Sequence, residues 1–330
     1  MTICLSDDST VIMLLCSNLT TRKVDSEYKP YTISQWNKLT EKLIKCGKTP
    51  KDLFNIDSIV SELNIDDEEY LRIKYLISRV GNLSIVISQL NSLGINIVTR
   101  ADKNYPRIYK SKLKKQAPAF LYYAGDLQLY DKQNIAVVGS RNIDESGIEF
   151  TRKFVKLVCK NNFSIISGGA RGVDSIAEKT ALDNDGKIII VVSDSFSKKI
   201  KNKDIRNAIL QKRCLVVSTF HPEEHFMSYN AMDRNKYIYA ASKYALIVAS
   251  DYKKGGTWAG AIENYKKNWA SLIVRKDLQN TPIGNLKLLE MNNVYPIEDI
   301  TDEFSFNNFI NSQNINLSTN VISKQMSMFE

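Results

Sequence analysis

Three glycine-rich loops carry the residues of this 330-residue chain that are best suited to holding an anion. The stretch SIISGGARGVDSIAEKTAL, residues 164–182, is an apolar run followed by a turn of small residues and then a helical pattern. Glycine permits positive φ and lets a ligand approach the main chain. The first N–H groups of the helix favour an anion at the same point, and phosphate is the commonest one so held. For this loop alone, a turn that uses glycine only for packing is an equal alternative.

Two similar loops strengthen the first interpretation. AVVGSRNIDESG and VASDYKKGGTWAGA each follow an apolar run and precede a helical pattern. Since the carboxyl ends of parallel strands meet at one sheet edge, we expect one crevice lined by backbone amides and by Arg141, Arg171, Lys253 and Lys254. None of the three loops has the spacing of a Walker P-loop or of a dinucleotide motif. ATP hydrolysis and nicotinamide chemistry therefore lose support.

The elements that position these loops are short β-branched runs alternating with helices. This pattern predicts an α/β fold with a mostly parallel sheet covered by helices on both faces. The expected strands are Ile95–Thr99, Ala119–Tyr123, Ile135–Val138, Ser164–Ile166, Lys187–Val192, Leu215–Ser218, Ala245–Ala249 and Ser271–Val274. Residues 1–92 predict helices instead, over Ile33–Cys46 and Tyr70–Leu93.

Composition and charge narrow the class of protein. With 43% apolar and 25% charged residues the chain is typical of a soluble globular protein. Its 45 Lys and Arg exceed its 36 Asp and Glu, which gives a net charge of +9. Residues 101–115 and 197–213 hold much of this excess. Two basic segments beside anion-suited loops favour a polyanionic partner, although such segments are usually solvated faces.

Cysteine usage and hydropathy indicate the compartment. The five cysteines form no C-x-x-C pair, which fits neither a disulfide framework nor a zinc site. The apolar run Val11–Cys16 is too short to span a bilayer, and acidic residues precede it where a signal peptide would be basic. We therefore expect a cytoplasmic protein.

An ordered set of motifs resembles one known family. AVVGSRN, SGGARGVDSIAEKTAL, MDRNKYIYAAS and GGTWAGA stand in the order and spacing of the DNA-processing protein A family (DprA, also called Smf). The resemblance covers about residues 94–280. It implies a Rossmann-like fold, single-stranded DNA binding without catalysis or cofactor, a homodimer, and transfer of DNA to a RecA-type recombinase during transformation. Carried over by position, the DNA-binding set is Gly139, Ser140, Arg141, Gly168, Gly169, Arg171, Gly172, Asp174, Arg234, Asn235, Lys254, Gly255, Gly256 and Thr257.

The sequence also differs from the family pattern, and these differences affect the expected domains and role. The N-terminal helices are hard to match, and GGTWAGA replaces a serine-rich SGSLITA stretch. Only about 50 residues follow the core, so no C-terminal winged helix is expected. The expected domains are a helical domain over 1–93, a DprA-like Rossmann domain over 94–300, and a C-terminal helix and flexible tail over 301–330. Such divergent members also occur in anti-phage defence pairs, which leaves transformation, recombination and defence open.

Individual residues have predicted roles. Arg171 is expected to reach a phosphate or stack beneath a base. Asp174 is expected to cap the helix or orient Arg171 rather than touch DNA. Arg234 and Asn235 are expected before a helix, facing the crevice. Two of the five aromatics near the motifs should be exposed, and Tyr252 and Trp258 are the best stacking candidates; the others are Tyr229, Tyr237 and Tyr239.

Catalytic alternatives find less support. The only histidines, His221 and His225, lie near Pro222 without an H-E-x-x-H pattern, so no metal site is expected. Nucleoside-phosphate hydrolases of the same superfamily place a glutamate soon after a glycine turn, and Glu263 falls about a helical turn late. The alternative of a sensor or hydrolase for a nucleotide-derived small molecule stays open, as does a pure interaction module.

The C-terminal residues QMSMFE resemble a short peptide that binds the bacterial sliding clamp. Gln325 would satisfy a polar rim, while Met326, Met328 and Phe329 would fill an apolar groove. A tail that packs back on the core is the alternative.

Overall fold

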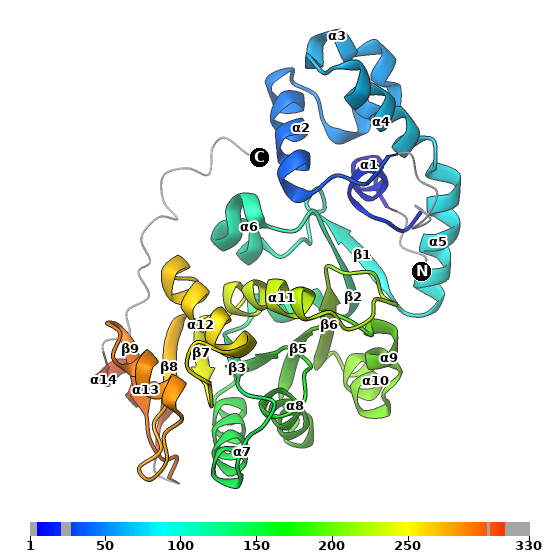
Figure 1. Cartoon of the computed structure of the whole chain (residues 1–330). Coiled ribbons are helices and arrows are strands. Elements are labelled where there is room, and N and C mark those ends of the chain that lie inside the picture. The colour runs from blue at the N-terminus through cyan, green and yellow to red at the C-terminus, as the bar shows by residue number, and fades with distance from the viewer. Residues whose placement is uncertain (1–4, 21–27, 302–303, 314–330) are drawn as a thin grey trace. The chain divides into compact units, whose positions relative to one another are not determined.

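The computed structural model of the chain describes residues 5–20, 28–301 and 304–313 (Figure 1). Nine strands form a mostly parallel sheet in the order β1-β2-β6-β5-β4-β3-β7-β8-β9, which confirms the predicted α/β class. The chain divides into two compact units, residues 1–131 with 189–237 and residues 132–188 with 238–330. Among the described residues no helix is long and apolar enough to cross a membrane.

The first unit begins with helices packed around their own apolar core. Trp36, Leu39 and Leu43 of one helix lie fully buried against Val11 and its neighbours. Thr32 and Gln35 close a capping box at the start of that helix. The elements are α1 (Asp7–Cys16), α2 (Ile33–Lys45), a 3-10 segment (Pro50–Ser58), α3 (Val60–Leu63), α4 (Asp67–Ile77) and α5 (Val80–Ser92).

The single helix predicted over Tyr70–Leu93 is wrong, because the chain breaks between α4 and α5. Arg79 lies at the break and is buried. Its guanidinium donates to the carbonyl oxygens of Leu14 at 2.9 Å and Leu76 at 3.2 Å. A buried guanidinium needs such acceptors, and the Leu14 carbonyl, 65 residues away, is one that the local helical pattern does not reveal.

The rest of the first unit contains the antiparallel strands of the sheet. β1 pairs with β2, and β2 pairs with β6, both antiparallel. β5 begins in the second unit and ends in this one, whereas α11 begins in this unit and ends in the second. The elements are β1 (Asn96–Thr99), α6 (Arg107–Leu113), 3-10 segments at Lys114–Gln116 and Leu127–Asp131, β2 (Phe120–Gly125), β5 (Lys187–Val191), α9 (Phe196–Lys201), α10 (Lys203–Leu210), β6 (Cys214–Ser218) and α11 (Ser228–Ala240).

The second unit is a parallel α/β assembly. β3 pairs with β4 and β7, β7 with β8, and β8 with β9, all parallel. All five residues of β3 are buried, as expected of a strand covered on both faces. The elements are β3 (Asn134–Val138), α7 (Glu145–Lys160), β4 (Ser164–Ser167), α8 (Val173–Asp183), β7 (Tyr244–Ile247), α12 (Gly255–Lys267), β8 (Ser271–Arg275), α13 (Ile283–Leu289), β9 (Val294–Ile297) and α14 (Phe306–Ser312).

This unit contains the switch point of the sheet, which bears on function, and the helix α14, which is packed on its core. The strand order reverses between β3 and β7, and α/β sheets bind ligands at such a switch point, beyond the carboxyl ends of the strands. α14, the last helix of the described residues, is anchored by the fully buried Phe306, whose ring lies edge-on to Phe154, Phe163 and Tyr244. The predicted domain boundaries at 93 and 300 stay predictions, and the tail from 314 lies outside the described residues.

Candidate nucleic-acid interface

The first two glycine loops meet at Gly172. This glycine has φ of +79°, and a Cβ there would stand 2.4 Å from the Ser140 carbonyl oxygen and 2.6 Å from that of Arg141. The Val173 N–H also donates to the Ser140 carbonyl oxygen at 3.3 Å. Only glycine allows this approach, so the loops after β3 and β4 lie against each other.

The third loop joins them through the turn after β3. The Ser140 N–H donates to the Ala249 carbonyl oxygen at 2.9 Å. A Cβ on Gly139 would stand 2.5 Å from Cγ2 of Val173 and 3.3 Å from the Ala249 nitrogen. The structure therefore brings together all three loops that the sequence singles out. We call residues 139–142, 168–174 and 251–257 the loop cluster.

Positive charge is exposed on the loop cluster. Arg141, Arg171, Lys253 and Lys254 are all exposed. Arg171 and Arg141 are close in space, because a Cβ on Gly172 would stand 2.7 Å from the Arg141 Cα. These groups can form charge-assisted hydrogen bonds with a phosphate backbone.

Helix ends add to this positive potential. The N-caps of α8 and α12 are Gly172 and Lys254, and neither provides a capping side chain. In contrast, Asp144 caps α7 by accepting from the Gly147 N–H at 2.8 Å. A helix start without a side-chain cap is well suited to an anion. The starts of α8 and α12 are therefore better suited to a phosphate than the start of α7.

Asp174 orders the turn that carries Arg171. The side chain is buried, and its Oδ2 accepts from the N–H groups of Gly168 at 3.1 Å and Ala170 at 3.3 Å. These two amides are engaged within the protein. An anion at this loop would therefore meet Arg171 and the start of α8.

The aromatic candidates differ widely in exposure. Tyr252 is 39% exposed, and its ring contacts half-buried Trp258 edge-on at 5.0 Å between centroids. Tyr237 and Tyr239 are buried, whereas Tyr229 is 63% exposed. Two of the five aromatics are therefore exposed, as predicted, but they are Tyr252 and Tyr229, whereas Trp258, preferred because it flanks the glycine turn, is half-buried.

Arg234 and Asn235 lie in the first unit, and their predicted place before a helix is wrong. Both lie inside α11. Arg234 is buried, and its Nη1 donates to the Val191 carbonyl oxygen at 2.8 Å, at the end of β5. This contact gives Arg234 a structural role, and its contact with DNA stays a prediction.

The residues considered for metal binding, hydrolysis and clamp binding form no further site in the described residues. His221 Nδ1 accepts from the Glu223 N–H at 3.2 Å within its own turn. No group of His, Cys, Asp and Glu suited to a metal ion occurs in the described residues. Glu263 is half-buried in α12. The clamp-peptide residues Gln325, Met326, Met328 and Phe329 lie outside the described residues.

Comparison with known proteins identifies the family. The family model of DNA recombination-mediator protein A matches residues 96–305, about two thirds of the chain. The chain belongs to the DNA recombination-mediator protein A family. The match includes the whole loop cluster together with Arg234 and Asn235, and confirms the resemblance that the motifs indicate.

Three relatives illustrate the extent of the similarity. The Bacillus subtilis DNA processing protein DprA is 27% identical over 52% of this chain and 57% of its own length. The chain thus spans little more than half of that relative. The Streptococcus pneumoniae DprA structure has a TM-score of 0.59 at 20% identity, covering 84% of this chain and 99% of the other. The Helicobacter pylori DNA processing protein A, whose structure concerns its single-stranded DNA binding mode, has a TM-score of 0.51 at 25% identity, covering 67% and 96%.

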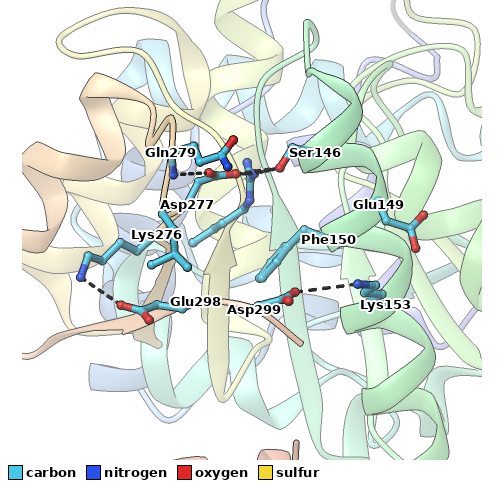
Figure 2. Close-up of a pocket in the computed structure, with 11 residues that line it drawn as sticks. Ser146, Glu149, Phe150, Lys153, Lys276, Asp277, Gln279, Glu298 and Asp299 are labelled. Carbon is cyan, nitrogen blue, oxygen red and sulfur yellow. Dashed lines mark hydrogen bonds and ion pairs between the residues drawn. The ribbon is translucent and has the colours of Figure 1, made fainter. Parts of the chain in front are cut away.

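The second unit also contains a polar pocket, near the start of α7 and the ends of β8 and β9 (Figure 2). Its volume is about 320 Å³. Ion pairs line it, with Lys153 3.8 Å from Asp299 and Lys276 3.0 Å from Glu298. The sequence does not indicate this pocket, since its residues form no recognisable motif.

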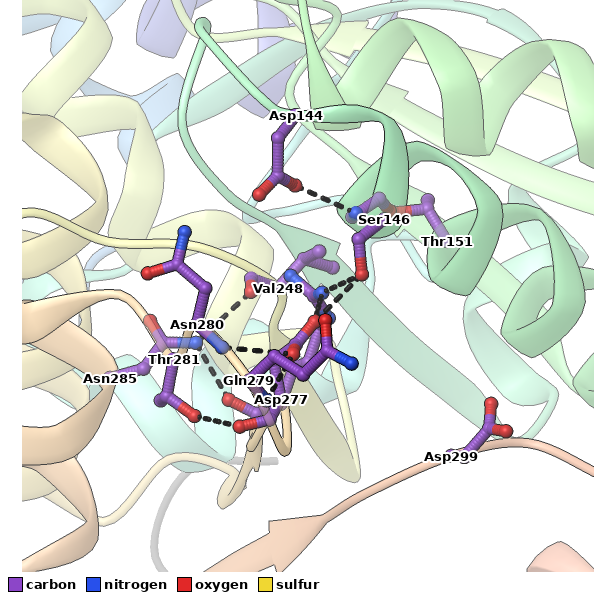
Figure 3. A network of polar contacts seen from close by, with 12 residues as sticks. Asp144, Ser146, Thr151, Val248, Asp277, Gln279, Asn280, Thr281, Asn285 and Asp299 are labelled. Atoms are coloured by element: carbon purple, nitrogen blue, oxygen red, sulfur yellow. Dashed lines mark hydrogen bonds and ion pairs between the residues drawn. The ribbon is translucent and has the colours of Figure 1, made fainter.

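In the wall of the pocket, a network centred on Asp277 joins three segments of the second unit (Figure 3). Ser146 Oγ donates to the Asp277 carboxylate at 2.7 Å, and the N–H groups of Gln279 and Asn280 donate to it at 2.9 and 3.1 Å. The guanidinium of buried Arg275 pairs with the same carboxylate. Together these interactions lower the pKa of Asp277 to about 2. The hydrogen bond from Ser146 contributes most, followed by the two backbone donors and the charge of Arg275.

Asn285 extends this support to the third loop. Its Nδ2 donates to the carbonyl oxygens of Val248 at 3.0 Å and Arg275 at 2.9 Å, and its Oδ1 accepts from Ser250 Oγ at 2.9 Å. A Cβ on Gly284 would stand 2.3 Å from the Ser250 carbonyl oxygen. The start of α13 therefore fixes the segment that leads into the loop cluster.

Replacing Gly172 tests the contact that joins the loops. We predict that Gly172→Ala lowers the free energy of unfolding by about 3 kcal/mol, because strain at positive φ adds to overpacking against two carbonyl groups. Gly255→Ala is the matched control, since Gly255 has φ of +73° with no atom near its absent Cβ. The control should lose only about 1 kcal/mol in denaturant unfolding. Equal losses would contradict the close approach at Gly172.

Replacing Asp277 tests the network. Its folded-state pKa is lowered, so its stabilising contribution is present above the unfolded pKa and is lost as the pH falls through the folded one. Asp277→Asn should cost about 2–4 kcal/mol at neutral pH, and the difference from wild type should shrink as the pH falls from about 4 to 2. Asp299→Asn, at the exposed pair with Lys153, should cost less than about 1 kcal/mol. Denaturant unfolding of both proteins across this pH range measures the difference in unfolding free energy. A difference between wild type and Asp277→Asn that stays constant would contradict the lowered pKa of Asp277.

Proposed function

We propose that this chain binds single-stranded DNA at the loop cluster and acts without catalysis in DNA processing, recombination or defence against foreign DNA. One observation carries the proposal. Four exposed basic residues gather where three loops meet, beside two helix starts that lack a capping side chain. This arrangement suits a chain of phosphates better than a single small anion, because the charges extend over several loops.

Similarity to relatives supports the proposal. The loop cluster lies wholly within the matched family region. The Helicobacter pylori relative, for which a single-stranded DNA binding mode is described, covers 67% of this chain. The switch point between β3 and β7 is also the place where α/β sheets bind ligands.

An exposed aromatic favours single strands over duplex. Tyr252 lies in the loop cluster beside Lys253, whose Nζ is 5.0 Å from the centre of the tyrosine ring. Unpaired bases stack on such rings, whereas the bases of a duplex are already stacked. Tyr252 would therefore hold a base while the neighbouring cations hold its phosphates.

The basic residues of the loop cluster give the first test. Arg141→Ala, Arg171→Ala and Lys254→Ala should each weaken oligothymidylate binding by about 1–2 kcal/mol and lower the salt slope by about 0.7 for each phosphate that is no longer neutralised. Lys179→Ala is the matched control, because Lys179 is exposed on α8 beyond its first turn. Fluorescence anisotropy over a range of salt concentrations measures both quantities. Unchanged binding by all three variants would overturn the proposal.

Tyr252→Ala separates stacking from charge in the same assay. It should lose about 1–3 kcal/mol of binding free energy while the salt slope stays the same, since no cation is removed. A lower salt slope in this variant would contradict the stacking role.

A nucleotide-sensing or hydrolytic role is the alternative for the same loops. Glu263 is the acidic residue on which such chemistry would depend. We predict that the purified protein releases neither phosphate from ATP nor base from nucleoside monophosphates, as measured by chromatography of the products. Turnover by wild type that Glu263→Gln abolishes would replace the proposal with the enzymatic alternative.

The predicted partners complete the proposal. They are a second copy of this chain, a RecA-type recombinase, and a sliding clamp bound through Gln325, Met326, Met328 and Phe329. We place this activity in the cytoplasm. Titrating the isolated clamp with a peptide of residues 320–330 and its Phe329→Ala copy tests the clamp contact, which equal or absent binding by both would overturn.

A further inference from the structure

A second basic surface lies on α9 and α10 of the first unit. Residues 197–213 contain seven Lys and Arg and one acid, Asp204. Lys198 and Lys201 of α9 and Lys203 and Arg206 of α10 are all exposed. We call these four residues the α9–α10 patch.

The two helices present these side chains in matched pairs. Lys198 and Lys201 are three residues apart, as are Lys203 and Arg206, so the members of each pair share one helix face. Phe196 and Ile205 are buried and hold the other side of the helices in the core. Both helices contact β6, and Figure 1 shows them side by side. Packing therefore fixes the helices that carry the four cations.

Internal interactions do not account for this concentration of charge. Within the described residues none of the four side chains makes an ion pair. Like charges at this spacing repel each other and destabilise a helix. Lys203 also begins α10, where the helix dipole is positive. An external polyanion would relieve both effects.

The other basic segment, residues 101–115, differs in each respect. Lys115 pairs with Glu41 at 2.8 Å, and Lys110 lies over the ring of Tyr105 at 5.7 Å. Burial lowers the pKa of Lys112 to about 8. Internal contacts thus occupy much of that segment. Of the two basic segments, both of which the structure describes, the one on α9 and α10 is therefore better placed to meet an external anion.

We infer that the α9–α10 patch binds the sugar–phosphate backbone of single-stranded DNA, as a second contact in addition to the loop cluster. The inference rests on the proposed function, because it assigns the same ligand a second binding surface, on the first unit. The four residues of the patch include no aromatic side chain with which to read or stack bases. The patch therefore adds affinity that depends on strand length and salt and is independent of base sequence.

The test compares strand lengths. The quadruple variant Lys198→Gln, Lys201→Gln, Lys203→Gln, Arg206→Gln is titrated with oligothymidylates of about 8 and about 30 nucleotides, chosen on either side of typical single-strand site sizes. The long strand should bind more weakly, with its salt slope lowered by about 2–3, or about 0.7 for each phosphate that is no longer neutralised. The short strand should bind the variant within about twofold of wild type, because the loop cluster can hold it alone.

A control of equal charge separates the patch from net charge. Lys29, Lys38, Lys45 and Lys51 are exposed in the N-terminal segment, and their fourfold change to Gln removes the same charge. This control should bind the long strand as wild type does. If thermal unfolding shows that the quadruple variant is destabilised, the double variants Lys198→Gln, Lys201→Gln and Lys203→Gln, Arg206→Gln replace it, each with half the effect on slope.

The outcomes distinguish this inference from the proposed function. Wild type that binds neither strand would overturn both. Wild type that binds both strands, with loop-cluster variants weakened but the quadruple variant unchanged on the long strand, would overturn only the α9–α10 contact. If the quadruple variant and its control bind the long strand equally weakly, the loss of affinity follows from net charge alone. That result would also overturn the inference.

Discussion

The backbone of Gly172 lies so close to the carbonyl oxygens of Ser140 and Arg141 that no side chain fits between them. This contact is the constraint on which the loop cluster depends. Parallel pairing of β3 with β4 and β7 brings the ends of these strands to one edge, but it leaves the loops beyond them undetermined. The approach at Gly172 and the Ser140 bond to Ala249 fix the three loops against each other. The exposed cations therefore stand on a preorganised support, which reduces the ordering cost of binding.

Carboxylates around the loop cluster serve this organisation. Asp174 is buried on the amides of its own turn, and Asp277 is engaged by Ser146, backbone N–H groups and Arg275. Asn285 ties the end of β7 to β8 and α13. A carboxylate at a site for anions would be expected to repel them. Asp174 is instead used to order the turn that carries the exposed Arg171.

The sequence predicts the sheet better than the helices. Eight of the nine strands follow from β-branched runs between helical patterns, and the glycine loops follow from the motifs. The helix predicted over Tyr70–Leu93 is divided at buried Arg79, and one of its acceptors, the Leu14 carbonyl oxygen, comes from a distant part of the chain that no local pattern indicates. The predicted place of Arg234 and Asn235 before a helix is wrong because α11 already begins at Ser228, six residues before Arg234. The Asp277 network joins residues more than 100 positions apart, so no local pattern predicts it.

Hydrogen–deuterium exchange of the full chain, with and without saturating oligothymidylate, tests the central claim most directly. The account predicts slower exchange on DNA binding in peptides that contain residues 139–142, 171–173 and 252–257, where a bound strand would cover the exposed turns. The amides of Gly168 and Ala170 should change least among the loop residues, because they already donate to Asp174. Protection confined to other segments, with these peptides unchanged at saturation, would contradict binding at the loop cluster.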